Sequence, residues 1–317
     1  MKVFSVIALI VASFGAFAEE EESAHDIILK VNEQALEEGL AFGSIDQPPL
    51  IEGDIIDDDD TRQKMEAASR GGAAAFDALN GGKWQNGVVP YVFGNVGSRA
   101  RSQILKAVEE YKRKTCIKFI PRTNQRDYVI FNARSGCYSQ IGRTGRGRQE
   151  ISIGRGCESM GTVIHEMMHA IGFFHEQSRR DRDNYVKIYW NNISSNMKFN
   201  FNMYRQGQAD THNEPYDKQS VMHYSRYSFS INRRPTIVSK TNENERLGNN
   251  YGFTDIDVRQ INKHYGCSGG GPNPPTTGKP VPPTDCKDIS QVCADHKHKC
   301  QTNDFVARRC QKTCGFC

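Results

Sequence analysis

The stretch His165–Glu176 reads HEMMHAIGFFHE, and the interpretation of the remaining sequence depends on it. His165 and His169 are four residues apart, so on a helix their imidazoles lie on one side and reach a common metal ion. Gly172 can end that helix in a backbone conformation that other residues resist. The chain can then bring His175 in as a third ligand. Three neutral nitrogens leave one coordination position open, so the stretch predicts one zinc ion in a catalytic site.

Glu166 follows the first of these histidines, where its carboxylate can take a proton from water that the metal activates. The alternative is that these are ordinary helix residues. The short pattern HExxH also occurs in structural helices, whereas the full stretch is much rarer by chance. Four apolar residues within it need no chemical role and are predicted to pack around the site: Met167, Met168, Phe173 and Phe174.

Residues 1–18 are typical of a secretory signal, with Lys2, a short apolar core and the small-x-small cleavage site AFA. Its apolar run is too short to span a bilayer, and no later run is longer. The sequence contains ten cysteines, which suits an oxidising compartment. We therefore expect a secreted, extracellular protein without membrane insertion.

Charge divides the chain into two parts. Residues 19–70 contain 16 Asp/Glu and 4 Lys/Arg, a net charge of −12, and residues 71–317 contain 36 Lys/Arg and 21 Asp/Glu, a net charge of +15. The acidic part has few aromatic residues and is a poor candidate for an independent core. It is predicted to be a removable pro-segment, attracted to the basic part, that an activating protease cuts; the alternative is a disordered tail. The predicted cut sites are Arg62, Lys64 and Arg70.

The basic residues of 71–317 are scattered and form no nucleic-acid-binding motif, so no nucleic-acid partner is expected. Strands are predicted at residues 88–93, 128–131 and 150–154. A helix is predicted over 98–114, capped by Ser98, with one apolar face made of Ile104, Leu105, Val108 and Tyr111. A last helix is predicted from Thr254, in a capping box with Asp257, to about Tyr265. These elements predict an α+β domain at 71–267.

The C-terminal end of the chain differs in composition. Residues 268–285 hold six of the twelve prolines and are predicted to be an extended linker. Residues 286–317 hold six cysteines and are too few to fold on apolar burial alone, so disulfides must stabilise them. Within the domain, Asn192 begins the triplet Asn-Ile-Ser, which is an acceptor motif for glycosylation.

The full pattern ending in Glu176 resembles the astacin metalloproteases, a family of the metzincin group. The resemblance covers about residues 84–267 and extends into the pro-segment. It implies two subdomains with the active-site cleft between them. The stretch SVMHY at 220–224 resembles the methionine turn of the family. By that resemblance Met222 lies beneath the zinc, and Tyr224 is a further zinc ligand that swings away to stabilise the transition state.

The same resemblance implies the disulfides Cys116–Cys267 and Cys137–Cys157. The stretch IEGD at 51–54 resembles the aspartate switch of the family, in which Asp54 binds zinc in place of water and silences the zymogen. It departs from the family at Ile51, where Phe is usual. Glu176 resembles the residue that receives the new N-terminus after activation. A cut after Arg70 would leave a longer N-terminus than the family pattern, which suggests a start near Ala75.

Residues 286–317 resemble the ShK toxin-like domain, named for a potassium-channel blocker. The resemblance implies the pairs Cys286–Cys317, Cys293–Cys310 and Cys300–Cys314. The lysine of the channel-blocking pair is missing from NDFV at 303–306, so docking to matrix or substrate is expected in place of channel block. Astacin domains followed by such modules occur in cnidarian and nematode proteases.

Together these features predict a monomeric, secreted zinc endopeptidase, made as a zymogen, that hydrolyses extracellular proteins, including matrix proteins. The substrate is expected to add as a strand to residues 150–154. An acidic residue after the cleaved bond would suit four arginines: Arg143, Arg146, Arg148 and Arg226. The alternative is a toxin or binding protein whose protease fold only carries the small module; the intact set of site residues argues against it.

Overall fold

The computed structural model describes residues 22–37, 48–63, 82–204 and 211–267. Contacts divide the chain into the units Met1–Gly271 and Pro272–Cys317, and the described residues lie in the first unit. Several predictions fall outside the described residues: the signal sequence at 1–18, the cut sites Lys64 and Arg70, the linker at 268–285 and the six-cysteine module at 286–317.

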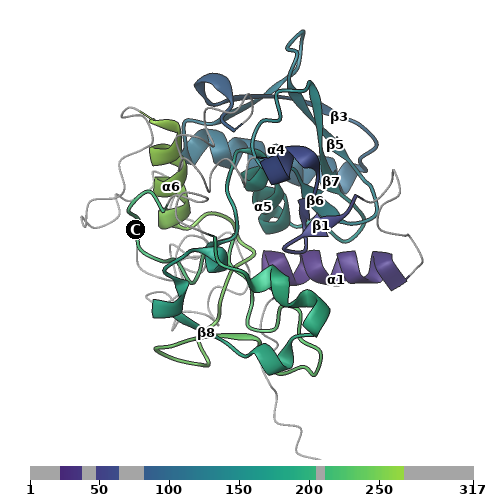
Figure 1. Cartoon of the computed structure of the whole chain (residues 1–317). Helices are drawn as coiled ribbons and strands as arrows, with labels where there is room; N and C mark the ends of the chain where they lie inside the picture. Colours follow the sequence, from purple (N-terminus) through teal and green to yellow (C-terminus); the bar gives the residue numbers. More distant parts are fainter. Residues whose placement is uncertain (1–21, 38–47, 64–81, 205–210, 268–317) are drawn as a thin grey trace, which may run out of the picture. The chain divides into compact units, whose positions relative to one another are not determined.

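The described chain combines one large sheet with α-helices and a separate two-stranded sheet (Figure 1). The main helices are α1 Ala24–Glu37, α4 Ser98–Lys114, α5 Met160–Ala170 and α6 Asp255–Tyr265, and residues 59–63 are also helical. The strands are β1 Leu50–Ile51, β2 Ile55–Ile56, β3 Val88–Phe93, β4 Lys118–Pro121, β5 Tyr128–Asn132, β6 Cys137–Ser139, β7 Arg148–Ile153, β8 Val186–Ile188 and β9 Ile237–Ser239. Short 3-10 helices cover Gln85–Gly87, Glu176–Ser178, Arg182–Asn184, Trp190–Asn192 and Ser195–Phe201.

The large sheet has the strand order β1-β2-β6-β7-β5-β3-β4. Strands β4, β3, β5 and β7 are parallel, and β6 is antiparallel to β7. The predicted pro-segment supplies β1 and β2, and β2 pairs in parallel with β6 through Ile55 and Ser139. The pro-segment therefore covers the outer edge of β6 and extends the sheet of the basic domain.

Helices α4 and α5 pack together beside this sheet, and their buried residues belong to the largest apolar core. The prediction for 98–114 is confirmed in extent and wrong in two details. The residue before the helix is Gly97, without a side-chain cap bond, so Ser98 is the first helical residue and not the cap. Ile104 and Tyr111 are buried as predicted, but Leu105 is 47% exposed.

The second part of the domain carries the β8–β9 sheet, most of the 3-10 helices and a smaller apolar core that includes Phe201 and Tyr224. Helix α6 begins at the predicted capping box of Thr254 with Asp257 and ends at Gly266 in the left-handed conformation. The structure forms the disulfides Cys116–Cys267 and Cys137–Cys157, which are the pairs that the family resemblance implies.

Helix α1 is a feature that the sequence does not predict. It packs against α5 and β6, and Figure 1 shows it between the large sheet and the part that carries β8. Ile28 of α1 is fully buried within the largest apolar core, together with residues of α4 and α5. The described residues of the predicted pro-segment thus contribute to the largest apolar core of the structure. No helix in the described ranges has the length and apolar character needed to cross a membrane.

His264 on α6 provides a test of stability against pH. Its ring packs against Phe173, and Nε2 is buried with no hydrogen-bond partner among the described residues. Burial, followed by the charge of Lys83, lowers the pKa of His264 to about 2. Between pH 6.5 and that value only the unfolded chain takes up this proton, so stability is lost as pH falls below 6.5, by at most about 1.4 kcal/mol per pH unit.

We therefore expect the unfolding free energy of His264→Phe to fall less steeply with pH between pH 7.5 and pH 5. The difference in slope corresponds to the uptake of at most one proton. The phenylalanine keeps the aromatic packing against Phe173 and removes the titration. Urea unfolding of both proteins at several pH values measures the slope. An equal slope in the two proteins would contradict the assignment.

Candidate metal centre

Helix α5 positions the first two histidines of the predicted zinc site. Its N-cap, Ser159, accepts a hydrogen bond from the backbone of Thr162, and all residues from Gly161 to Ala170 are buried. His165 and His169 therefore lie one turn apart on a helix that is buried on all sides. The helix ends at Ala170, and Gly172 then adopts a φ of 107°, a conformation that favours glycine.

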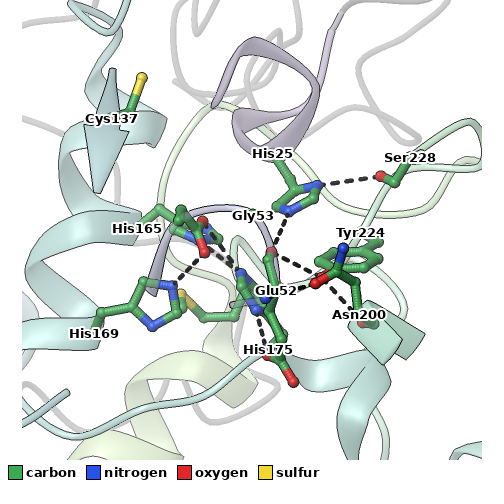
Figure 2. Close-up of polar contacts among 12 residues, drawn as sticks. His25, Glu52, Gly53, Cys137, His165, His169, His175, Asn200, Tyr224 and Ser228 are labelled. Carbon is green, nitrogen blue, oxygen red and sulfur yellow. Dashed lines mark hydrogen bonds and ion pairs between the residues drawn. The ribbon is translucent and has the colours of Figure 1, made fainter. Parts of the chain in front are cut away.

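The third histidine completes the cluster together with a carboxylate of the pro-segment (Figure 2). Asp54 Oδ2 lies 2.9 Å from His165 Nε2 and 3.3 Å from His175 Nε2. Asp54 Oδ1 lies 3.5 Å from His169 Nε2. The four side chains are buried, and their ligand atoms all lie within 4.8 Å of one another. The structure thus brings together the three predicted ligands and the predicted switch residue.

Each histidine uses its other ring nitrogen to donate to an oxygen. His165 Nδ1 donates to the carbonyl of Val221 over 2.8 Å, and His169 Nδ1 donates to the carbonyl of Phe173 over 2.7 Å. His175 Nδ1 donates to Glu52 Oε2 over 2.7 Å. These bonds fix the ring orientations and, for neutral rings, leave the Nε2 lone pairs directed at the centre of the cluster.

The donor set fits one zinc ion. Nε2 lone pairs and carboxylate oxygens are all acceptors, so their approach within 2.9 to 3.5 Å requires a cation or a proton between them. Asp54 Oδ1 and His169 Nε2 are buried with no hydrogen-bond partner in the described ranges. Burial alone would raise the pKa of Asp54, but His175 and His169 hold it well below its usual range. Three imidazoles and a carboxylate match the ligands that zinc prefers.

Glu166 lies on α5 beside His165 and does not join the cluster. Its two carboxylate oxygens are buried and have no hydrogen-bond partner among the described residues. Burial, and then the charge of Asp54, raise the pKa of Glu166 well above its usual value. A buried carboxylate without a partner, next to a metal site, is suited to accept a proton.

Tyr224 lies close to the cluster but directs its hydroxyl elsewhere. The hydroxyl donates to the carbonyls of Glu52 over 2.8 Å and Asn200 over 3.2 Å. The ring stacks on His25 of α1, with 3.9 Å between the ring centroids (Figure 2). Its role as a metal ligand stays a prediction. Met222 is buried in the large core, and its carbonyl accepts from the backbone N–H of Glu176 over 3.0 Å.

Glu176 is buried and already has partners. Its Oε1 accepts from Arg179 Nη1 over 3.0 Å and from the backbone of Asp217 over 2.9 Å. Burial raises the pKa of Glu176 to about 7, against the opposing charge of Arg179. The role of Glu176 as partner of a new N-terminus stays a prediction, and Arg179 is the cation that faces it here.

Three pro-segment residues outside the predicted set hold the segment in place. The carboxylate of Glu52 accepts from Tyr204 over 2.7 Å and from Ser178 over 2.9 Å, besides its bond to His175. The Asn32 side chain donates to the carbonyl of Cys137 over 2.9 Å and accepts from its N–H over 2.8 Å, as a neighbouring strand would. The third is His25, which stacks on Tyr224. Glu52 lies in the IEGD stretch, but the resemblance gives a role only to Asp54, and the other two residues belong to a helix that the sequence analysis does not predict.

The predicted substrate strand at 150–154 is wrong as an edge. Strand β5 pairs with one edge of β7, and β6 covers the other edge along Ile151–Ile153, so a substrate strand cannot add there. Without β1 and β2, the edge strand of the large sheet beside the cluster is β6. Pro-segment residues cover this edge, and the Ser139 N–H donates to the carbonyl of Asp54 over 3.0 Å.

The predicted arginines are spread around the domain. Arg143 binds Asp127 over 2.5 Å, and Arg146 lies 3.6 Å from Asp60 of the pro-segment. Asn192, the glycosylation candidate, donates from Nδ2 to the carbonyl of Pro235 over 2.7 Å. The selection of acidic substrates and the glycan both stay predictions.

Comparison with known proteins gives two family matches. The model described as Astacin (Peptidase family M12A) matches residues 78–266, more than half of the chain, and the model described as ShK domain-like matches residues 285–317. Zinc metalloproteinase nas-4 of Caenorhabditis elegans is 45% identical over 190 residues, covering 59% of this chain and 60% of the relative. Human meprin A subunit beta is 43% identical over 188 residues, covering 59% and 27%.

A solved structure is also similar. High choriolytic enzyme 1, a hatching enzyme zinc-protease from the medaka Oryzias latipes, superposes with a TM-score of 0.54 at 42% identity, covering 58% of this chain and 93% of the other. The matched region spans between 45% and 60% of the length of three nematode relatives, nas-4, nas-13 and nas-15.

Proposed function

Since the chain belongs to the astacin family of peptidases, we propose that it is a secreted zinc-dependent endopeptidase, made as a zymogen, that hydrolyses peptide bonds of extracellular proteins. The observation that carries the proposal is the convergence of three imidazole Nε2 atoms on one point, with the unpaired carboxylate of Glu166 on the same helix. The names of the zinc metalloproteinase relatives support the same chemistry.

In this proposal His165, His169 and His175 hold the zinc ion, and Tyr224 joins them after activation. Bound zinc supplies Lewis-acid polarisation of the scissile carbonyl and of the attacking water. Glu166 accepts a proton from that water and passes it to the leaving amine. The Tyr224 hydroxyl, once released from the carbonyls of Glu52 and Asn200, donates to the oxyanion of the transition state.

The pro-segment silences this site by occupying it. With zinc bound, Asp54 would take the place of the water that the reaction needs. Asn32 and Asp54 satisfy the backbone groups of β6. We propose that a protease cuts between Arg62 and Ala75 and frees the segment. An extended substrate then takes the edge of β6, where Cys137 and Ser139 offer backbone groups to it.

The remaining features are proposals of the same kind. The domain limits are those predicted from sequence, with a signal at 1–18, a pro-segment at 19–70 and a protease domain at 71–267. The ShK-like module docks the enzyme to matrix or substrate, and the enzyme acts as a monomer. A toxin or carrier role would need a dead protease site, and the complete set of buried site residues favours an active one.

Digestion of casein by trypsin-activated protein tests the proposed function. We expect activity that a zinc chelator abolishes and that added zinc restores. Removal of the ion from the three histidines takes away the Lewis acid that catalysis needs. Mass spectrometry of the activated protein locates its N-terminus in the same experiment. Digestion that continues in excess chelator would contradict the proposal.

A further inference from the structure

A small apolar cluster lies beside the metal centre, separate from the two larger cores. Its buried members are Ile55 and Ile141, both 0% exposed, and Ile51 and Phe174 pack against them. Ile51 and Ile55 come from the pro-segment strands β1 and β2. Ile141 and Phe174 come from the protease domain. The cluster is therefore an apolar contact between the silencing segment and the enzyme.

Two members of the cluster are sequence neighbours of residues in the metal centre. Ile55 directly follows Asp54, and Phe174 directly precedes His175. Ile141 lies two residues after Ser139, the partner of Ile55 on the edge of β6.

Contacts within the protease domain also hold the protease side of the cluster. The N–H of Gly142, next to Ile141, donates to the carbonyl of His169 over 2.8 Å. The ring of Phe174 contacts that of Tyr204, with 4.6 Å between centroids. When Ile51 and Ile55 leave with the pro-segment, Ile141 and Phe174 lose two apolar partners inside the cleft. Apolar surface left at a binding cleft marks a ligand contact.

The sheet register says which substrate residue would fill this place. Residues paired directly across two strands direct their side chains to the same face of the sheet, in either strand direction. A substrate residue opposite Ser139 on β6 would therefore direct its side chain as Ile55 does, towards Ile141. This step rests on the proposed function, because it requires that substrates bind along β6.

We propose that Ile141 and Phe174 form an apolar subsite that selects substrates with a branched aliphatic side chain at the residue paired with Ser139. The pro-segment places Ile55 in this subsite, one residue from the carboxylate that occupies the metal centre. The alternative is an apolar latch that serves the pro-segment alone, and it predicts no preference in the substrate.

Cleavage of a peptide library by the trypsin-activated wild-type protein tests the subsite without any variant. We expect Ile, Val and Leu to be enriched at one position close to the cleaved bond. A matched pair of peptides, with Ile or Ser at that position, should differ at least about tenfold in kcat/KM, the usual size of an apolar pocket's discrimination.

Two variants then assign the preference to the subsite. Ile141→Thr keeps the branch point at Cβ but replaces the ethyl group with a hydroxyl, and it should lower the Ile-to-Ser ratio of kcat/KM about tenfold. Leu105→Thr is the matched control, because Leu105 is exposed on α4, outside the cluster, and its ratio should equal the wild-type value. Zinc content and thermal unfolding check that both variants are folded.

The outcomes separate the subsite from the protease function. Wild-type protein that cuts peptides with no aliphatic preference at any position near the bond would overturn the subsite and leave the protease intact. An unchanged ratio in folded Ile141→Thr would overturn the assignment to Ile141. Wild-type protein that cuts no peptide at all would instead contradict the protease function.

Discussion

Activated protein with glutamine at Glu166 is expected to cleave casein about 100 to 10,000 times more slowly than the wild type, the usual contribution of a positioned general base. Glutamine has the size and shape of glutamate and can donate or accept a hydrogen bond, but it cannot take up a proton at neutral pH. The carboxylate of Glu166 has no hydrogen-bond partner among the described residues, so the substitution breaks no hydrogen bond among them.

Zinc content distinguishes loss of the base from loss of the metal. Glu166 lies outside the cluster of ligand atoms, so Glu166→Gln should retain one zinc per chain. His169→Gln is the comparison, because it removes a member of the cluster and should lose both zinc and activity. Full activity in Glu166→Gln would refute the proposed mechanism, and loss of zinc from it would make the carboxylate a ligand.

The protease side of the site could be predicted because local spacing encodes it. Two histidines four residues apart need only a helix to face one metal, and Gly172 supplies the turn that returns the third. The same holds for the capping box at Thr254, which is a relation between neighbours. The methionine turn and both disulfides came from family resemblance, since residues so far apart in sequence give no local signal.

The errors and omissions share one physical cause, which is dependence on distant partners. Helix α1 has an apolar face at helical spacing, formed by Ala24, Ile28 and Val31, but this face is buried only because the protease core accepts it. The edge strand β6 has three residues, too few to show an alternating pattern, whereas the longer β7 shows one. Leu105 fits the apolar face of α4 by spacing but lies where no neighbour covers it.

The proposed silencing of the enzyme would depend on such distant contacts, and Asp54→Ala tests it. We expect the uncut zymogen with this change to gain at least about 100-fold in casein cleavage. Removing one partner of a buried ion pair typically costs about 3 to 5 kcal/mol, and each 1.4 kcal/mol shifts the closed-to-open equilibrium of the segment tenfold. Mass spectrometry must confirm that the chain is uncut.

Asp57→Ala is the matched control. It removes an aspartate of the same segment that pairs with the exposed Arg62, and it should leave the zymogen silent because such surface pairs contribute little. Equally low casein cleavage by the uncut Asp54 and Asp57 variants would mean that Asp54 does not keep the segment in the active site.

The contacts of Tyr224 predict that Asp54 is not the only restraint. His25 stacks on the Tyr224 ring, and the carbonyls of Glu52 and Asn200 hold its hydroxyl, so Tyr224 stays away from the oxyanion position even when Asp54 is gone. His25→Ala alone should release little activity, because Asp54 still fills the metal centre. Added to Asp54→Ala, it should raise activity about tenfold further, the scale of one lost aromatic contact. A double variant no more active than Asp54→Ala would show that Tyr224 is released as soon as the carboxylate leaves.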